Sequence, residues 1–380
     1  MPRVSVVIVT HNCRDDIRRC LDSLPQECEV IVLDNGSTDG TSEIVERDYR
    51  QARLIRNTEN RGFGPANNQG LGVATCDYAL LLNPDAWAEP GAIERLTEFM
   101  DSRPSAVACG GRLNHANSTL QESAAGELTL WAVFCEQTLL EKLFRGSRLF
   151  SPYWLSGRHV RSHSPSPNPL PPGEGRNGNP LPPGEGDEEP PPPSAGDGRG
   201  GGGATRPLQV TQVMGACLLM RRVDGEFVRF DERFFLYCED TELCRRLRSG
   251  DAGAPSPALP RRAGEWAAGH AGEERPSEIW YVPDAVFGHA LGQSSIRDRW
   301  RAVRYYNRGK ELYFRIHHGP ASAFACFTLN RLGALLRLIV WGLPALLTLG
   351  LLPRFRSQAA LFARVLFGPI DPYPGSPQES

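Results

Sequence analysis

The sequence predicts an α/β fold with a mostly parallel, Rossmann-like central sheet and flanking helices. Apolar runs typical of strands buried on both faces alternate with segments whose apolar residues recur at helical spacing. Each of the clearest runs ends in a cluster of polar residues. Because parallel strands joined by right-handed crossovers bind ligands at their carboxyl ends, we expect one crevice at that edge of the sheet.

The first hundred or so residues can be assigned element by element. The first strand covers residues 4–12, and Ile17, Cys20, Leu21 and Leu24 follow at helical spacing. The pattern then repeats along the chain, with strands expected at 29–35, 52–57, 77–86 and 105–113, a short helix around Ile44 and a longer one that begins at Pro90.

Two low-complexity stretches interrupt this pattern. Residues 164–207 carry 13 prolines and 11 glycines and repeat the motif NPLPPGEG, so they cannot bury enough apolar surface to offset their conformational entropy. We therefore predict a disordered insertion there and a second, shorter one at 250–277. A tolerated surface insertion is the favoured interpretation; a mobile lid and a proline-rich ligand for a partner protein are the alternatives.

Composition and charge argue against two classes of protein, nucleic-acid binders and disulfide-stapled secreted domains. The chain has 380 residues, and its 42 basic and 44 acidic residues give a net charge of -2, so no nucleic-acid partner is expected. Its ten cysteines include no C-x-x-C pair, and the chain is far longer than a disulfide-stapled secreted domain. We expect reduced thiols and a cytoplasmic protein.

The C-terminal region is apolar from Ala323 to Leu352. Its longest uncharged run, LIVWGLPALLTLGLL, has 15 residues, whereas a spanning helix needs about 20. Arginines flank this run on both sides, which suits a segment that lies in the membrane interface beside anionic lipids. In-plane or monotopic attachment is therefore expected, with a spanning helix or hairpin and a buried soluble helix as alternatives.

Three polar clusters follow the predicted strands, at residues 10–12, 34–40 and 83–86. Asp34 is placed to accept hydrogen bonds from a ribose or a base edge. Asp85 is placed to ligate a hard divalent cation that also holds phosphate oxygens. Helix caps and turns are the alternative for each cluster taken alone.

Seven motifs occur in order over most of residues 3–316: VSVVIVTHN, VIVLDNGSTDGT, NRGFGPANNQGL, LLLNPDA, VMGACLLMRR, FDERFFLYCEDTELCRRLR and YVPDAVFGHALGQSS. With this set the sequence resembles glycosyltransferase family 2, the inverting transferases with a GT-A fold. The NPDA form and the later segment YYNRGKELYFRIHHG resemble the rhamnosyltransferase branch. The resemblance implies a nucleotide-sugar-binding half at 1–163, an acceptor and catalytic half at 208–316, and a membrane-associating segment with a tail at 317–380.

The resemblance also implies roles for single residues. The positions matched to the nucleotide sugar are Thr10, Asn12, Asp34, Asn35, Asp39, Asn60, Gly62, Asn83 and Asp85. Asp85 matches the last acid of the D-x-D metal motif, and His289 matches a histidine that in some relatives ligates the metal or contacts the diphosphate. The expected cofactor is Mg²⁺ or Mn²⁺. Asn83 stands where many members have the first acid, which argues against a strong metal dependence because an amide is a poorer ligand.

Asp240 matches the family's catalytic base. In an inverting transfer this carboxylate takes the proton of an acceptor hydroxyl while a nucleotide diphosphate leaves from the opposite face. Glu239 would raise the basicity of Asp240 or bind the acceptor; acids that simply favour a helix N-terminus are the alternative for the pair.

The expected reaction moves rhamnose from dTDP-rhamnose to a saccharide or lipid-linked saccharide acceptor of a cell-surface polysaccharide. It would take place at the inner face of the cell membrane. The alternatives are a UDP-sugar donor and a catalytically inactive scaffold in a polysaccharide assembly complex. A sugar-1-phosphate nucleotidyltransferase is disfavoured because VIVTHNCRDD lacks a glycine-rich loop with an arginine and a lysine.

Overall fold

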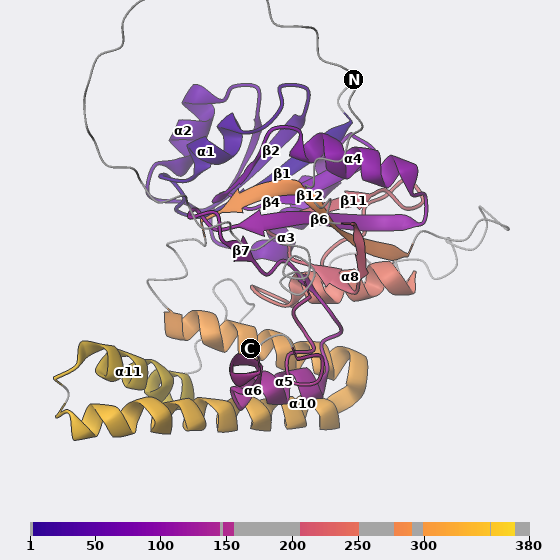
Figure 1. Cartoon of the computed structure of the whole chain (residues 1–380). Coiled ribbons are helices and arrows are strands. Elements are labelled where there is room, and N and C mark those ends of the chain that lie inside the picture. Colours follow the sequence, from indigo (N-terminus) through magenta and orange to yellow (C-terminus); the bar gives the residue numbers. More distant parts are fainter. Residues whose placement is uncertain are drawn as a thin grey trace, which may run out of the picture.

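The computed structural model describes residues 3–144, 147–155, 206–250, 277–290, 299–349 and 351–368 (Figure 1). The first predicted insertion, apart from residues 206 and 207, and the second, apart from residues 250 and 277, lie outside the described residues. Gly292 and Ser294, which follow His289 in its motif, also lie outside them.

A ten-stranded mixed sheet forms the centre of the molecule. Its main path runs β3-β2-β1-β4-β11-β6-β12-β5. The first four of these strands are parallel: β1 (Val4–Thr10), β2 (Glu29–Asn35), β3 (Arg53–Asn57) and β4 (Tyr78–Leu82). The predicted α/β fold with a mostly parallel sheet is thus confirmed, and β1 and β4 are buried along their whole length.

The second half of the sheet contains antiparallel pairs that the alternation of strands and helices did not predict. β11 (Cys217–Arg221) lies antiparallel between β4 and β6 (Ala106–Asn114), and β12 (Glu278–His289) runs parallel to β6. The remaining strands are short: β5 (Ala86–Ala88), β7 (Leu120–Gln121) and β9 (Leu208–Val210) extend this sheet, while β8 (Ala124–Ala125) and β10 (Gln212–Val213) pair with each other. The expected strand at 77–86 ends at Leu82 because Asn83–Asp85 forms a turn, closed by a bond from Ala86 N to Asn83 O.

Helices cover both faces of the sheet (Figure 1). One face packs against α1 (Ile17–Asp22), α2 (Thr41–Asp48) and α4 (Ala92–Ser102). The other packs against α3 (Phe63–Val73) and α8 (Glu239–Ser249). In α4 the side chains of Ile93, Leu96 and Met100 recur at helical spacing and are buried, which explains why this segment folds as an amphipathic helix.

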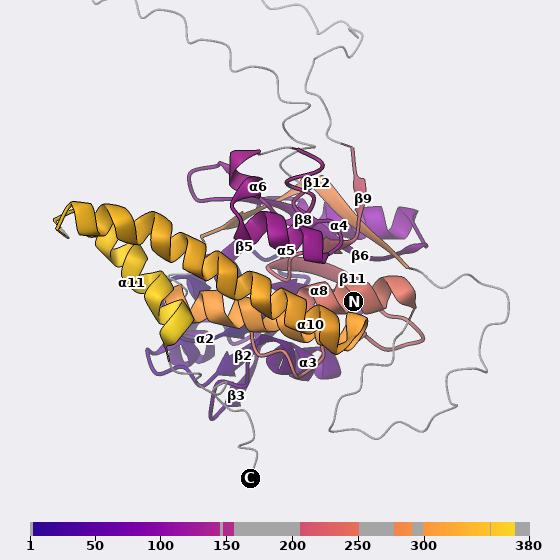
Figure 2. The ribbon, with the colours of Figure 1, turned by 90° about the horizontal axis from the view of Figure 1, so that it is seen from below.

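A third layer of helices lies below the sheet domain in the view of Figure 1. It contains α5 (Leu130–Gln137), α6 (Leu140–Leu143), α10 (Arg299–Leu347) and α11 (Pro353–Phe367). α10 bends at Gly319, whose φ is +83°, directly before Pro320, so that it consists of a first arm (299–318) and a second arm (320–347). Figure 2 shows both arms crossing beneath the sheet domain. Val133, Phe234, Tyr313 and Cys326 share one apolar cluster, which joins this layer to the domain above it.

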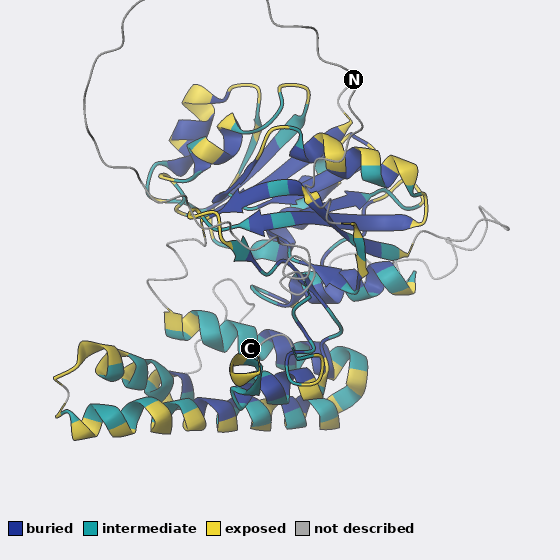
Figure 3. Cartoon of the chain, in the orientation of Figure 1, coloured by how far each residue is buried: buried dark blue, intermediate teal, exposed yellow. Residues whose placement is uncertain are grey.

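The second arm of α10 is exposed over much of its apolar surface (Figure 3). Among the described residues, α10 is the one helix long and apolar enough to cross a membrane, and only 28% of its most apolar 18-residue stretch is buried. Leu343, Leu346 and Leu347 are all more than half exposed. A fully buried helix, one of the alternatives from the sequence, therefore does not describe this segment.

Candidate active site

The carboxyl ends of β1 and β2 are joined by side-chain hydrogen bonds. The buried Thr10 donates from Oγ1 to Asp34 Oδ1 at 3.2 Å, and Asp34 Oδ2 accepts from the Ser37 N–H at 3.3 Å. Asn12 Oδ1 accepts from the Thr38 N–H at 2.8 Å. These bonds hold the two strand ends in one polar surface, as the sequence predicted for Thr10, Asn12 and Asp34.

Asp39 shapes the loop that follows β2. Its carboxylate accepts from Arg14 N at 3.0 Å, from Thr41 N at 3.0 Å and from Thr41 Oγ1 at 2.6 Å. Burial raises the pKa of Asp39, but these hydrogen bonds outweigh it and leave the pKa below the ordinary value. The chain's own donors occupy this carboxylate, so its direct role here is to fasten the loop to α1 and α2.

Asn35 connects the end of β2 to the loop before α3. Its Nδ2 donates to Asn60 Oδ1 at 3.1 Å and to Gly62 O at 3.0 Å. Gly62 has a φ of +93°, and a Cβ there would lie 2.6 Å from Phe235 O, so only glycine fits. The Phe63 N–H donates to the same carbonyl, which fixes the loop that leads into α8.

Asn83, Asp85 and His289 lie together at the ends of β4 and β12. His289 Nε2 is 3.2 Å from Asp85 Oδ1 and 3.3 Å from Asn83 Nδ2, and Nδ1 is 3.1 Å from Gln121 Oε1. The amide oxygen of Gln121 can only accept, so Nδ1 carries a hydrogen and Nε2 is the nitrogen that faces the Asp85 carboxylate.

Asp85 and His289 can share a divalent cation. Asp85 Oδ1 and His289 Nε2 are 3.2 Å apart, which suits neighbouring positions around a cation with bonds of about 2.1 Å. The described part of the chain has no group of three or more acidic, histidine or cysteine side chains that could hold a metal alone. Asp85 and His289 therefore fit a Mg²⁺-type ion that takes its other ligands from phosphate oxygens and water.

Glu239 and Asp240 form the first turn of α8. Tyr237 and Cys238, just before it, both have positive φ values, 71° and 66°, a strained backbone of the kind that persists at functional sites. Asp240 Oδ2 accepts from Gly215 N at 3.0 Å, and Oδ1 accepts from Thr241 N at 2.8 Å. Both oxygens are thereby held in one orientation.

The environment raises the pKa of both carboxyls. For Asp240 burial is the main cause, and the backbone N–H groups of Gly215 and Thr241 act against it. For Glu239 burial and then the charge of Asp240 raise the pKa well above its usual range. Glu239 Oε2 is buried and has no hydrogen-bond partner among the described residues. A carboxyl in this state is suited to proton exchange or to a hydrogen bond with a bound hydroxyl group.

The two carboxyl groups are tied to the Asn83 loop through the backbone. Gly215 N binds Asp240, and the carbonyl of the next residue, Ala216, accepts from Asn83 N at 3.1 Å. Asp240 and the Asn83–Asp85 turn thus contact adjacent residues directly before β11. Gly215 was not singled out from the sequence, although it stands within the motif VMGACLLMRR.

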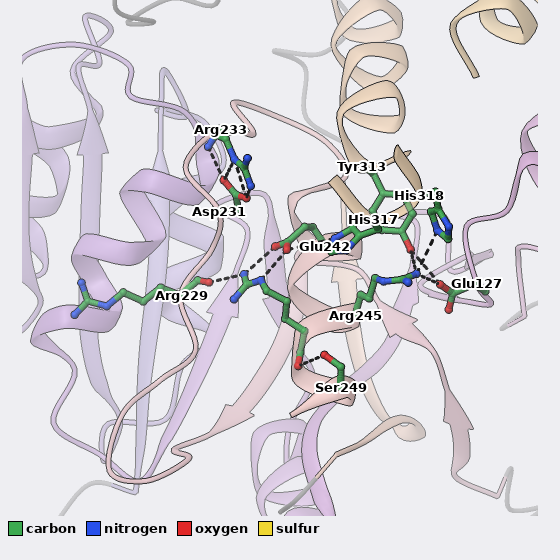
Figure 4. Close-up of polar contacts among 11 residues, drawn as sticks. Glu127, Arg229, Asp231, Arg233, Glu242, Arg245, Ser249, Tyr313, His317 and His318 are labelled. Carbon is green, nitrogen blue, oxygen red and sulfur yellow. Dashed lines mark hydrogen bonds and ion pairs between the residues drawn. The ribbon is translucent and has the colours of Figure 1, made fainter. Parts of the chain in front are cut away.

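α8 is held in place by a buried polar network, drawn in Figure 4. Glu242 and Arg246 are nearly fully buried and paired at 2.7 Å, and His317 at the end of the first arm of α10 lies 3.6 Å from Glu242. Arg245 binds Glu127 at 2.7 Å and also donates to the Tyr313 hydroxyl. These contacts lie on the α8 turns that follow Asp240 and connect its helix to α10.

α10 also touches the strained loop itself. Gly309 packs so closely that a Cβ there would lie 2.5 Å from Tyr237 O and 3.1 Å from Cys238 Cβ. Lys310, fully buried, binds Glu136 of α5 at 2.8 Å and lies 4.3 Å from the centre of the Tyr306 ring. The sequence offered no signal for this support, because it depends on how distant helices pack.

Residues 5–158, which include the four parallel strands and the polar residues at their ends, match the model of the family described as glycosyl transferase family 2. With this match and the relatives that follow, the chain is a glycosyltransferase.

The relatives include transferases from several bacteria. An N-acetylglucosaminyl-diphospho-decaprenol L-rhamnosyltransferase of Mycobacterium tuberculosis is 28% identical over 273 residues, which cover 67% of this chain and 73% of that protein. A chondroitin synthase of Pasteurella multocida is 33% identical over 110 residues, 27% of this chain and 11% of that protein. Among solved structures, the mannosyltransferase PcManGT from Pyrobaculum calidifontis in complex with GDP-Man and Mn²⁺ is 14% identical, covers 96% of this chain and 85% of its own, and has a TM-score of 0.41.

Proposed function

We propose that this glycosyltransferase transfers the sugar of a nucleotide sugar with inversion of configuration at the anomeric carbon, and that Asp240 is the base. One observation carries the proposal: a carboxylate with a raised pKa, held by two backbone N–H groups, follows a strained loop and is tied to the Asn83 turn. A raised pKa strengthens the base, because general-base catalysis is most effective when the pKa lies near the working pH.

The transfer is a single displacement. Asp240 accepts the proton of an acceptor hydroxyl, the hydroxyl oxygen forms the new bond to the anomeric carbon, and the bond to the nucleoside diphosphate breaks on the opposite face. Glu239, whose raised pKa favours the protonated form, donates from its unpartnered carboxyl to an acceptor oxygen and orients it. Tyr237 and Cys238 hold both carboxyls at the start of α8.

The donor is proposed to bind along the strand ends. Thr10, Asn12, Asp34 and Asn35 form the nucleotide side, and the Asn60–Gly62 loop closes it. Asp85 and His289 would hold Mg²⁺ or Mn²⁺, which when bound supplies positive charge to the leaving diphosphate. Asn83 adds an amide to this wall, with Nδ2 at 3.3 Å from His289 Nε2.

The sugar and the acceptor are proposed from the relative in Mycobacterium tuberculosis. Its name describes transfer of L-rhamnose to an N-acetylglucosaminyl-diphospho-decaprenol, and that alignment covers two thirds of this chain. We therefore favour dTDP-rhamnose as donor and a lipid-linked saccharide as acceptor, used at the inner face of the membrane. The exposed apolar surface of α10 supports attachment to that membrane.

A thermal-stabilisation screen tests the donor. Purified full-length chain is heated with dTDP-rhamnose, UDP-glucose, UDP-galactose or GDP-mannose, each with and without Mg²⁺ or Mn²⁺. A ligand that binds only the folded state adds about 2.7 kcal/mol at a hundred times its dissociation constant. Selective stabilisation by dTDP-rhamnose, lost in Asp34→Asn, supports the proposal. Selective stabilisation by a UDP-sugar would replace the donor, and no response from the folded protein would indicate an inactive scaffold.

A further inference from the structure

A small cavity of about 160 Å³ lies inside the bend of α10. The residues that line it come from both arms of α10 and from α11: Arg304, Asn307, Arg308, Glu311, Phe327, Asn330, Arg331 and Val365. None of them belongs to the site described above, although Asn307, Arg308 and Glu311 lie in the segment YYNRGKELYFRIHHG.

Three guanidinium groups meet one carboxyl group at this cavity. Arg304 donates to Gly368 O at 2.9 Å, and Arg331 donates to the carbonyls of Val365 and Leu366 at 3.2 and 3.1 Å, so both are oriented by the end of α11. Arg308 lies one helical turn after Arg304 on the same side of α10. Guanidinium forks match phosphate oxygens in geometry and charge, so this wall suits a phosphate group.

The cavity also offers hydrogen-bond acceptors. Asn330 is 2% exposed; its Nδ2 donates to Glu311 Oε1 at 2.9 Å, while its buried Oδ1 has no partner in the part of the chain that the structure describes. Burial is the main cause that raises the pKa of Glu311. A ligand that carries hydroxyl groups beside a phosphate would satisfy the orphaned oxygen of Asn330.

Several exposed apolar residues lie on the second arm of α10, from Phe324 onward. Phe327 lines the cavity and is 39% exposed, and Phe324 beside it on the helix is 70% exposed. Further along the second arm, Leu335, Ile339 and Leu343 are exposed at helical spacing. A molecule with its charged group in the cavity would therefore place apolar chains against this surface.

The cavity faces away from the strained loop at Tyr237 and Cys238. Tyr306, Gly309 and Tyr313 of the first arm contact the loop, α8 or the Glu127 segment, whereas Arg304, Arg308 and Glu311 line the cavity. With about 100° between successive helical residues, these two sets occupy opposite sides of α10. The body of the helix thus separates the cavity from Asp240, which favours an anchoring lipid over the acceptor substrate.

We propose that this cavity binds the headgroup of an anionic glycerophospholipid of the phosphatidylglycerol type. The phosphate lies on Arg304, Arg308 and Arg331, the headgroup hydroxyls face Asn330, and the acyl chains lie along the second arm. The inference gives the proposed membrane attachment a specific site. It does not depend on the transfer reaction, since its test uses binding alone.

The test compares full-length chain and two single variants on vesicles of phosphatidylcholine, with and without phosphatidylglycerol. Arg308→Gln removes a charge from the cavity, and Arg354→Gln removes one from an exposed position on α11. A basic residue that is merely near an anionic surface contributes about fivefold in affinity, so Arg354→Gln should weaken binding about fivefold. Arg308→Gln should weaken it about thirtyfold, because a charged hydrogen bond is lost as well.

Two further measurements distinguish a phospholipid headgroup from the diphosphate of a lipid-linked acceptor. Short-chain phosphatidylglycerol below its micelle concentration should stabilise the wild-type chain against heat and leave Arg308→Gln unaffected. Vesicles that contain a polyprenyl diphosphate in place of phosphatidylglycerol should show no such preference. Equal weakening by the two variants would overturn the site in favour of diffuse attraction, and a selective response to polyprenyl diphosphate would overturn it in favour of an acceptor site. Equal melting temperatures of both variants without lipid confirm that each is folded.

Discussion

Replacement of Asp240 by asparagine removes the proposed base and keeps its size. In the native site Asp240 accepts two backbone hydrogen bonds, at 3.0 Å from Gly215 N and 2.8 Å from Thr241 N. Asparagine has one side-chain oxygen, so one of these N–H groups meets an NH₂ group and loses its acceptor. A buried donor left unpaired costs about 1–3 kcal/mol.

A second effect opposes this loss of stability. Burial raises the pKa of Asp240, which means that the folded state disfavours the charged carboxylate. The neutral amide removes that cost, so the net change in the free energy of unfolding should be smaller than about 3 kcal/mol. The effect on catalysis should be larger: loss of a general base lowers turnover by about 10² to 10⁴-fold, or about 3–5 kcal/mol of barrier.

The assay measures turnover and the donor dissociation constant of Asp240→Asn beside Asp101→Asn. Asp101 is a carboxylate at the end of α4 that binds Arg3 and Tyr78, outside the proposed site. We expect Asp101→Asn to keep wild-type turnover and Asp240→Asn to keep donor affinity while losing transfer. Turnover of the wild type should also fall as acid protonates Asp240, at a pH above the range for an exposed aspartate.

Two results would refute this reasoning. Turnover of Asp240→Asn within a few-fold of wild type would show that another group removes the proton. Loss of donor binding in proportion to turnover would make Asp240 a structural residue of the nucleotide site.

Three further predictions concern the groups around this base. Glu239→Gln should stabilise the fold increasingly as pH rises, because the wild type loses about 1.4 kcal/mol for each pH unit between the unfolded and the folded pKa of Glu239. The unfolded chain ionises first as pH rises, so wild-type stability falls between the unfolded and the folded pKa, and urea titrations against pH should show this fall only in the wild type. Asn83→Asp should tighten Mn²⁺ binding about tenfold by calorimetry, because a carboxylate is a better ligand than an amide; unchanged affinity would place the metal elsewhere. Gly309→Ala should cost about 1–3 kcal/mol and lower turnover, because the new Cβ meets Tyr237 O. Gly342→Ala in open space on the same helix should cost nothing, and equal effects would rule out a special role for the loop contact.

The sequence predicted the parallel half of the sheet because local patterns determine it. VSVVIVT and EVIVLDN are apolar without interruption, and the polar residues that follow them, Thr10 and Asp34, meet in the structure at 3.2 Å. β11 was not predicted because a short apolar run such as CLLMR fits a strand or a buried helix equally well. Its antiparallel position between β4 and β6 depends on partners more than 100 residues away in the sequence.

Candidate site residues could be predicted from the sequence only where the residue type itself indicates a chemical role. Asp240 and His289 carry titratable groups and stood in recognisable motifs. Gln121, which contacts His289, lies in the two-residue strand β7, and a single glutamine there gives no signal of a site. The positive φ values of Tyr237 and Cys238 were equally hidden, because neither residue type favours that backbone and tertiary contacts impose it.

The shared apolar cluster of α10 and the sheet domain decides how this protein can be made more soluble. A chain cut after His318 would lose Ala323 and Cys326, which are buried in this cluster with residues of the α5 segment. The truncation would therefore expose apolar side chains of the remaining domain to water. Substitution of exposed leucines on the second arm by polar residues would leave that cluster whole. For crystallisation and enzyme assays, polar substitutions on the second arm of α10 are therefore preferable to truncation of the chain.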